Sequence, residues 1–279
     1  MTTRPCLFVD VFTRVPLAGN GLAVVLGADD LDAGTMAAFA RYTNLSETTF
    51  VQASDHADYR VRIFTPGGEL PFAGHPTLGT AHAALSTAAV TPTAGRLVQE
   101  CTAGLVPLEA GGDGSWTFTA PRLEVGAEVD PEPFEEALGA RFEGPLLAVD
   151  VGPVWITGRL ADGDAIRALK PDFGAVARAC RVVDYAGLNV YGWDAAGPEV
   201  RSFAPDDGIA EDPVCGSGNV AVAAHLMATG SGARVEAGYV ARQGRCVGRD
   251  GYVSVRASAD GHVLVGGHSV TVVEGTVDL

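Results

Sequence analysis

The hydrophobic positions of this chain fall into short runs rich in Val, Ile and Phe, which alternate with longer stretches rich in Ala. Short β-branched and aromatic runs bounded by Gly, Pro or Asp are typical of strands, whereas Ala-rich stretches favour helices. The pattern predicts strands at 7–11, 22–26, 49–51, 59–64, 146–151, 154–159, 186–191 and 200–203. It predicts helices at 32–43, 75–86, 132–138, 173–179 and 218–229.

The order of these elements in the first half of the chain recurs in the second half. "FVDVF" with Asp10 matches "AVDVG" with Asp150, and a strand, a helix and a strand ending in Phe-x-Pro follow each. Asp10 precedes Phe64 by 54 residues, and Asp150 precedes Phe203 by 53. Each half then reaches a Gly-rich turn before an Ala-rich helix, "FAGHPTLGTAHAAL" or "VCGSGNVAVAAHLM". We therefore expect two similar α+β domains, each with a sheet packed around its Ala-rich helix.

The predicted domains are residues 1–122 and 123–279. The boundary falls in a Pro- and Gly-rich acidic stretch between Pro121 and Pro145, which is the weakest part of the pattern. With 279 residues, of which 47% are hydrophobic, the chain is long and apolar enough to bury a core in each half.

The net charge of −15 argues against partners that carry many phosphate groups, because an acidic surface repels them. Nucleic acids and anionic membranes are therefore poor candidates. The five cysteines show no CxxC spacing, which argues against a disulfide framework or a zinc site and favours a reducing cytoplasm. Asp10 interrupts the first apolar run, so no signal peptide is expected, and no uncharged stretch reaches membrane-spanning length.

The two Gly-rich turns are the best candidates for a site. Gly74 and Gly216 each precede a helix, whose first N–H groups and positive dipole end can bind carboxylate or phosphate oxygens. If the two halves face each other, both helix starts converge on one cleft that holds a small anionic substrate. The alternative is that they are ordinary helix starts, with Pro76 in the first turn.

Polar side chains beside these turns are further candidates. His75 lies in the apolar context "AGHP", and "EDPVCGSGN" places Asp212, Cys215 and Ser217 within six residues. A cysteine at a helix N-terminus is expected to have a lowered thiol pKa. Each residue also has a structural alternative: a packed histidine, a turn-forming aspartate, or a buried and inert cysteine.

Glu47 in "NLSETTFV" is the candidate general acid or base. The second half carries Tyr185 or Ala186 near the matching place, so the acid is not part of the repeated scaffold. A surface-loop glutamate is the alternative. The sequence contains no GxGxxG after a strand, no GxxxxGK[ST], no GxSxG and no histidine cluster with metal-ligand spacing. Cofactor-free proton transfer on a small molecule is the chemistry that remains.

Four motifs together resemble the phenazine-biosynthesis isomerase (PhzF-like) family: "DVFTRVPLAGN", "NLSETTFV", "RIFTPGGELPFAGHPTLGTA" and "EDPVCGSGN". The resemblance covers essentially the whole chain. It implies a diaminopimelate epimerase-like fold, in which two pseudo-symmetric domains flank a cleft and each wraps a curved mixed sheet around a central helix. It also implies a homodimer, and a last strand near 270–277 that returns to the first domain.

The resemblance implies an isomerase that moves a proton within a small amino-acid-derived carboxylate, with no metal or organic cofactor. The substrate of the phenazine enzyme is trans-2,3-dihydro-3-hydroxyanthranilate. Carried over by motif, Glu47 is the general acid and base, while His75 and Asp212 bind and polarise the substrate. The residues that would line the substrate pocket are Ser46, Gly74, Cys215, Gly216 and Ser217.

One departure from related enzymes leaves alternatives open. The amino-acid epimerases and proline racemases of this fold carry a catalytic cysteine in C-G-[TS]-G, which matches Cys215, and a second where this chain has Ala73. A racemase with two thiols is therefore unsupported. An epimerase, racemase or dehydratase that acts through Cys215 remains an alternative, as does a small-molecule-binding protein without turnover.

Overall fold

The computed structural model describes residues 2–279, and the chain divides into two compact units. Unit 1 extends to Thr119 and also contains Gly266–Leu279, whereas unit 2 is the continuous segment Ala120–Val265. The sequence predicts a division after residue 122, and the structure places it between Thr119 and Ala120.

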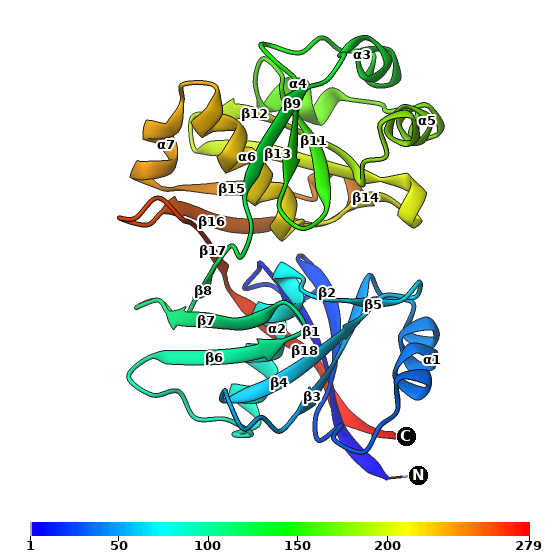
Figure 1. The fold of residues 1–279 in the computed structure, drawn as a ribbon, viewed down its shortest axis with the longest axis vertical. Coiled ribbons are helices and arrows are strands. Elements are labelled where there is room, and N and C mark those ends of the chain that lie inside the picture. Colours follow the sequence, from blue (N-terminus) through cyan, green and yellow to red (C-terminus); the bar gives the residue numbers. More distant parts are fainter. Residues whose placement is uncertain (1) are drawn as a thin grey trace. The chain divides into compact units, whose positions relative to one another are not determined.

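Unit 1 is built on a mixed sheet in which the first and last strands of the chain are neighbours (Figure 1). β1 (Thr3–Val11) pairs antiparallel with β2 (Asn20–Val25) and also with β18 (Ser269–Asp278). The last strand therefore completes the sheet in which the chain began. The other strands of this unit are β3 (Glu47–Gln52), β4 (Tyr59–Phe64), β5 (Glu69–Leu70), β6 (Arg96–Cys101), β7 (Gly104–Ala110) and β8 (Trp116–Thr119).

Helix α2 (Gly74–Ser86) forms the centre of unit 1. It contacts β1, β2, β3, β8 and β18, and its first eight residues are all buried, as expected for a helix enclosed by its sheet. Small residues allow this close approach, because a Cβ atom at Gly79 would lie 2.6 Å from a methyl group of Leu22. Helix α1 (Ala33–Thr43) lies outside the sheet and buries Met36 and Ala40 toward β3 and β4 (Figure 1).

Unit 2 surrounds its own central helix, α6 (Gly216–Ala228), which contacts β9, β10, β11, β12 and β16. Its strands are β9 (Glu124–Glu128), β10 (Leu147–Asp150), β11 (Val154–Arg159), β12 (Gly187–Asp194), β13 (Gly197–Ala204), β14 (Ile209–Asp212), β15 (Tyr239–Gln243) and β16 (Gly251–Ala257), and β17 (Val263–Gly267) leads back to unit 1. Its other helices are α3 (Glu132–Leu138), α4 (Gly163–Ala168), α5 (Phe173–Val183) and α7 (Gly232–Ala237), with 3-10 turns at Pro205–Asp207 and Arg245–Val247.

The strand pairings confirm the internal repeat. In unit 1, β1–β2 is antiparallel, β2–β3 parallel and β3–β4 antiparallel. In unit 2, β10–β11, β11–β12 and β12–β13 follow the same sequence of directions. The parallel pairs β4–β6 and β13–β15, and the antiparallel pairs β6–β7 and β15–β16, extend the match. The predicted α+β class, with a mixed sheet around a central helix in each half, is confirmed.

Helix α1 of unit 1 and helix α5 of unit 2 begin and end with the same kinds of cap. Asp32 and Asp172 precede α1 and α5, and each side chain accepts a hydrogen bond from the backbone N–H three residues later. Asn44 and Asp184 end the helices in the left-handed conformation, with φ of 53° and 56°. Such caps satisfy the terminal backbone groups of a helix, and Asn and Asp tolerate the left-handed region better than most residues.

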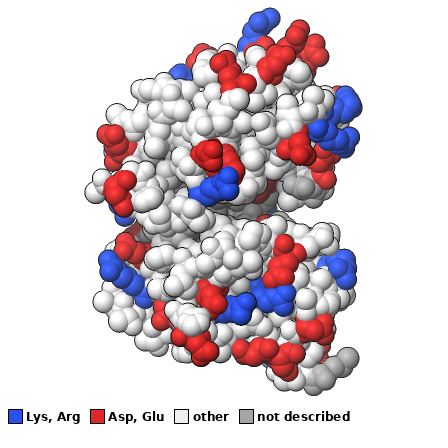
Figure 2. Space-filling model, in the orientation of Figure 1, with Lys and Arg blue, Asp and Glu red and all other residues white. Residues whose placement is uncertain are grey.

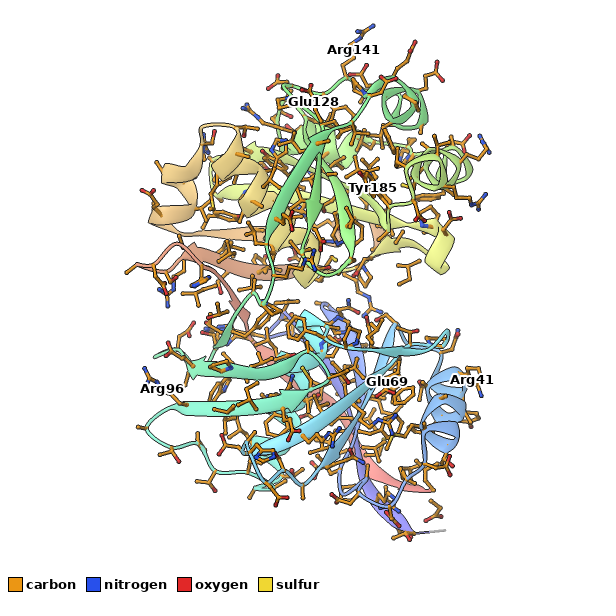
Figure 3. The ribbon with its side chains drawn as sticks, in the orientation of Figure 1. Arg41, Glu69, Arg96, Glu128, Arg141 and Tyr185 are labelled. Atoms are coloured by element: carbon orange, nitrogen blue, oxygen red, sulfur yellow. The ribbon has the colours of Figure 1, made fainter. Side chains whose placement is uncertain are left out.

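An ion pair recurs next to each Gly-rich turn. Arg62 on β4 forms a bidentate pair with Glu69 on β5, whose place on its strand is marked in Figure 3. Arg201 on β13 pairs in the same way with Glu211 on β14. Each guanidinium carbon lies 5.1 Å from the ring centre of the phenylalanine two residues later in the chain. This arrangement fixes the hairpin that leads into each central helix.

The surface shown in Figure 2 carries acidic side chains interspersed with basic ones. Within residues 2–279, no helix combines the length and the apolar character that crossing a membrane requires.

Candidate active site

Unit 1 gathers four polar side chains at the start of α2. The Oγ of Ser46 lies 3.5 Å from Asn20 Oδ1, and Asn20 Nδ2 lies 3.4 Å from Nδ1 of His75. The other ring nitrogen of His75, Nε2, lies 3.3 Å from Oε2 of Glu47. A continuous polar chain therefore runs from the Ser46 hydroxyl to the Glu47 carboxyl group.

Strand pairing brings these residues together. β2 and β3 are parallel, with Leu22 opposite Glu47, so Asn20 and Ser46 lie at the beginnings of neighbouring strands. The start of α2 supplies His75, which is 5% exposed. The sequence predicted Ser46, Glu47 and His75 as site residues, and the structure brings them together. Asn20, which joins Ser46 to His75, is not among the predicted site residues, although it is the last residue of the first motif, "DVFTRVPLAGN".

Glu47 opens strand β3 and only 14% of its side chain is exposed. The alternative of a glutamate in a surface loop is therefore wrong. Burial raises the pKa of Glu47 to about 7, because a charged carboxylate loses hydration in this position, while the hydrogen bond with Ser46 opposes the shift. A carboxyl group with this pKa can accept and return a proton near neutral pH.

The start of α2 itself is buried and lacks a side-chain cap. Ala73, the residue before the helix, is extended and makes no side-chain hydrogen bond, and Gly74 and His75 are both buried. The helix N-terminus carries the positive end of its dipole beside Glu47 and His75. The predicted position of Gly74 at this start is confirmed.

In unit 2, the predicted residues gather around the start of α6. Asp212 ends β14, and its Oδ1 accepts a hydrogen bond from the backbone N–H of Val214 at 3.0 Å. This is the turn-forming contact that a short side chain makes two residues along the chain. The structure thus brings Asp212 next to Cys215, Gly216 and Ser217 at one helix start.

The expectation of a lowered thiol pKa for Cys215 is wrong. Cys215 is the N-cap of α6, and its Sγ accepts from the backbone N–H of Gly218 at 3.3 Å. The side chain is nevertheless buried, with 4% exposure, and burial together with the nearby Asp212 carboxylate raises the pKa well above its usual value. The cost of placing a thiolate there outweighs the stabilisation from the helix terminus.

Trp155 contributes a contact at this helix start that the sequence did not predict. Its indole Nε1 donates a hydrogen bond to Oγ of Ser217 at 3.0 Å, and the residue is 5% exposed. Because a tryptophan in an apolar strand is typical of a core position, the sequence held no signal for this contact.

The second-half counterpart of Glu47 is Gly187. Glu47 opens β3 opposite Leu22, and Gly187 opens β12 opposite Trp155 in the equivalent parallel pair. The sequence placed the match at Tyr185 or Ala186, which precede the strand. A Cβ atom at Gly187 would lie 2.2 Å from the carbonyl oxygen of Phe203 and 2.7 Å from the Trp155 ring. Only the first half therefore carries an acid at this position, and in the second half the Trp155 ring lies where the side chain would begin.

The two groups of residues occupy different units, and the prediction that both helix starts line one cleft stays a prediction. Within residues 2–279, no three His, Cys, Asp or Glu side chains come together as a metal site would require.

Comparison with known proteins shows similarity along almost the whole chain. The profile of a family described as phenazine biosynthesis-like proteins matches residues 9–275. Antisense-enhancing sequence 1 of Schizosaccharomyces pombe is 36% identical over 99% of both chains. Trans-2,3-dihydro-3-hydroxyanthranilate isomerase of Pseudomonas fluorescens is 33% identical over 98% of this chain and 99% of that protein.

Solved structures share the fold. A phenazine biosynthesis protein of the PhzF family from Bacillus anthracis superposes with a TM-score of 0.86, at 24% identity and with full coverage of both chains. A probable proline racemase from Agrobacterium radiobacter K84 gives a TM-score of 0.70 at 16% identity, covering 99% of this chain and 93% of the racemase. The predicted diaminopimelate epimerase-like fold is thereby confirmed.

Proposed function

The chain belongs to the phenazine biosynthesis-like (PhzF-like) family, and on that premise we propose that it moves a proton within a small, amino-acid-derived carboxylate, with Glu47 as the general acid and base. The observation that carries this proposal is the mostly buried Glu47, whose pKa is about 7 and whose Oε2 lies 3.3 Å from His75.

The reaction is redox-neutral. The Glu47 carboxylate removes a proton from a substrate carbon, and the electron pair of that C–H bond moves into the neighbouring π system. The resulting carboxylic acid then returns the proton to another carbon of the same molecule. A group with a pKa near the working pH serves both steps, because neither its acid nor its base form is rare.

The remaining residues hold the substrate and its developing charge. His75 contacts the reacting carboxyl group of Glu47, and we assign it and Asp212 to binding and polarising the substrate. Ser46, Gly74, Cys215, Gly216 and Ser217 are assigned to its binding pocket. Backbone N–H groups at a helix start suit a carboxylate and stabilise negative charge that develops during proton transfer.

A relative that is 33% identical is named trans-2,3-dihydro-3-hydroxyanthranilate isomerase, which makes that compound the first substrate to test. The alternative of an epimerase, racemase or dehydratase that acts through Cys215 ranks lower. The thiol is buried and its pKa is raised, so the reactive thiolate is disfavoured at neutral pH.

The experiment incubates the protein with trans-2,3-dihydro-3-hydroxyanthranilate in deuterated water and follows loss of substrate and deuterium incorporation by NMR. Glu47→Gln keeps the size of the side chain and removes the proton acceptor. Because general acid–base catalysis contributes about 10²- to 10⁴-fold, we expect turnover to fall by at least about 100-fold.

Glu109→Gln is the matched control, since this glutamate lies in the same unit on β7 with its side chain 53% exposed. It should retain full activity. If Glu47→Gln folds and remains fully active, the role given to Glu47 is refuted. If alkylation of Cys215 in the folded protein abolishes turnover while Glu47→Gln does not, the thiol-based alternative replaces it.

A further inference from the structure

A network of buried neutral side chains lies beneath the start of α6. Its members have no measurable exposure, and each comes from a different element: Asn189 on β12, Ser202 on β13, Asn219 on α6 and Gln243 on β15. Buried polar groups are costly unless hydrogen-bonded, so the hydrogen bonds among these side chains favour one arrangement of the elements that meet there.

Gln243 is the centre of this network. Its Nε2 lies 3.1 Å from the backbone carbonyl oxygen of Asp212 and 3.3 Å from Oγ of Ser202, and donates to both. Its Oε1 accepts a hydrogen bond from Nδ2 of Asn219 at 3.0 Å. One amide group thus joins the end of β14, the middle of β13 and the first turn of α6.

Asn219 extends the connection to the other end of the turn. Its Nδ2 also donates to the backbone carbonyl oxygen of Cys215 at 2.9 Å. Asn189 supports the same turn from β12, because its Nδ2 donates to the carbonyl oxygen of Gly218 at 2.8 Å while its Oδ1 accepts from Ser202 at 2.7 Å. The carbonyl groups of Asp212 and Cys215 are therefore both tied to Gln243, the first directly and the second through Asn219.

A simpler form of the same arrangement supports the start of α2. Gln99 on β6 is fully buried, and its Nε2 donates to Oγ1 of Thr77, whose hydroxyl donates to the carbonyl oxygen of Ala73. Thr77 and Asn219 are each the fourth residue of their central helix. The recurrence of a buried glutamine at this place in both halves ties it to the helix start.

We propose that Gln243 is a positioning residue, which holds the turn Asp212–Gly216 in the geometry that binds substrate. The inference rests on the proposed function, which assigns Asp212 and the N-terminus of α6 to substrate binding. Gln243 lies beneath this turn and acts on the reaction through Asp212, Cys215 and Gly216.

The test compares Gln243→Met, which keeps the length of the side chain and removes its hydrogen bonds, with Phe134→Leu. Phe134 belongs to the core of unit 2 between α3 and α5, so its replacement lowers stability without touching the network. Hydrogen exchange measured by mass spectrometry reports the turn directly. We expect amide exchange in residues 212–219 to accelerate at least tenfold in Gln243→Met and to stay unchanged in Phe134→Leu.

A kinetic arm uses trans-2,3-dihydro-3-hydroxyanthranilate as the probe. A displaced turn should raise KM about tenfold while leaving the pH midpoint of kcat/KM unchanged, because the burial and the Ser46 hydrogen bond that set the pKa of Glu47 do not involve Gln243. A purely structural role would lower the amount of active protein and leave KM unaltered. If Gln243→Met does not fold, Ser202→Ala removes one anchor of both Gln243 and Asn189, and its effects should run in the same direction.

Unchanged exchange in residues 212–219, or an unchanged KM beside a lowered melting temperature, would overturn the proposal. If the wild-type protein does not turn over the probe, the substrate assignment fails, whereas the exchange rates still decide whether Gln243 holds the turn. The two failures are therefore distinguishable.

Discussion

The starts of the two central helices, α2 and α6, share their supports and differ in their chemistry. Both follow a strand clamped by an arginine–glutamate pair, and both rest on a buried glutamine. At α2, the second helix residue is His75, in contact with Glu47. At α6, the second helix residue is Ser217, in contact with Trp155. The repeat therefore preserves what holds a helix start in place and changes what a substrate would meet there.

The largest expected difference between the halves is the loss of stability when the arginine of each ion pair is replaced. The side chains of Arg201 and Glu211 are 5% and 3% exposed, whereas those of Arg62 and Glu69 are 22% and 33% exposed. Removing one partner of a buried pair leaves an uncompensated charge, so Arg201→Ala should lower the free energy of unfolding by about 3–5 kcal/mol. Arg62→Ala should lower it by about 1 kcal/mol or less, because solvent screens the pair. Equal losses in chemical denaturation would show that the two clamps do not differ.

Glu47 should make stability depend on pH near neutrality, which its counterpart Gly187 cannot do. Its pKa of about 7 in the folded protein lies above its ordinary value of 4.5, so the protonated form is the one that folding favours. The associated stability is present below pH 4.5 and is lost as the pH rises through 7. The free energy of unfolding of Glu47→Gln and of the wild type is measured by denaturation at pH 5 and at pH 8. Between these pH values, the variant should become more stable relative to the wild type by on the order of 3 kcal/mol. A difference that is independent of pH would contradict the raised pKa.

Gly187→Ala tests why the second half carries no acid. The added Cβ atom would meet the backbone carbonyl of Phe203 at 2.2 Å, and backbone cannot move as a flexible side chain does. We expect the free energy of unfolding to fall by about 1–3 kcal/mol. Gly112→Ala, where an added Cβ atom meets nothing within 4 Å, is the control and should be nearly neutral. If Gly187→Ala is as stable as its control, sterics do not keep a side chain out of this position.

Trp155→Phe should give the smallest effect. The phenyl ring fills most of the same space but removes the hydrogen bond from Nε1 to Ser217. The expected loss of stability is about 0.5–1.5 kcal/mol, read from thermal or chemical unfolding. Pairing this change with Ser217→Ala in a double-mutant cycle isolates the contact, and a coupling energy of zero would mean that the hydrogen bond contributes nothing.

Part of the fold could be predicted because its local signals agree with its tertiary structure. The helix after Asp32 and the helix after Asp172 were both found, since each combines an N-cap with an apolar face. Strands β6 and β15 were missed for a physical reason. Their buried positions include Gln99 and Gln243, so the alternation of apolar and polar residues that marks a half-buried strand is broken.

The residues of the candidate site also divide into those that the sequence groups and those that only the fold brings together. Ser46 and Glu47 are neighbours in one motif, and Asp212, Cys215 and Ser217 are neighbours in another, so the sequence already groups them. Trp155 and Gln243 meet those motifs only through the pairing of distant strands. For Cys215 the sequence leaves two readings open, a lowered thiol pKa or a buried and inert thiol, and the structure supports the second. The local sequence could not decide between them, because the degree of burial at a helix start is set by tertiary packing.

The pairing of β18 with β1 has a consequence for the order in which a nascent chain can acquire structure. Unit 2 is continuous, so all of it can fold soon after it leaves the ribosome. Unit 1 is made first, yet Thr3–Val11 must wait for Ser269–Asp278 before its sheet is complete. At about 5–20 residues per second, that delay lasts roughly tens of seconds. During translation the edge of β1 that later pairs with β18 stays open, and an unpaired strand edge is a site where other chains can add a strand.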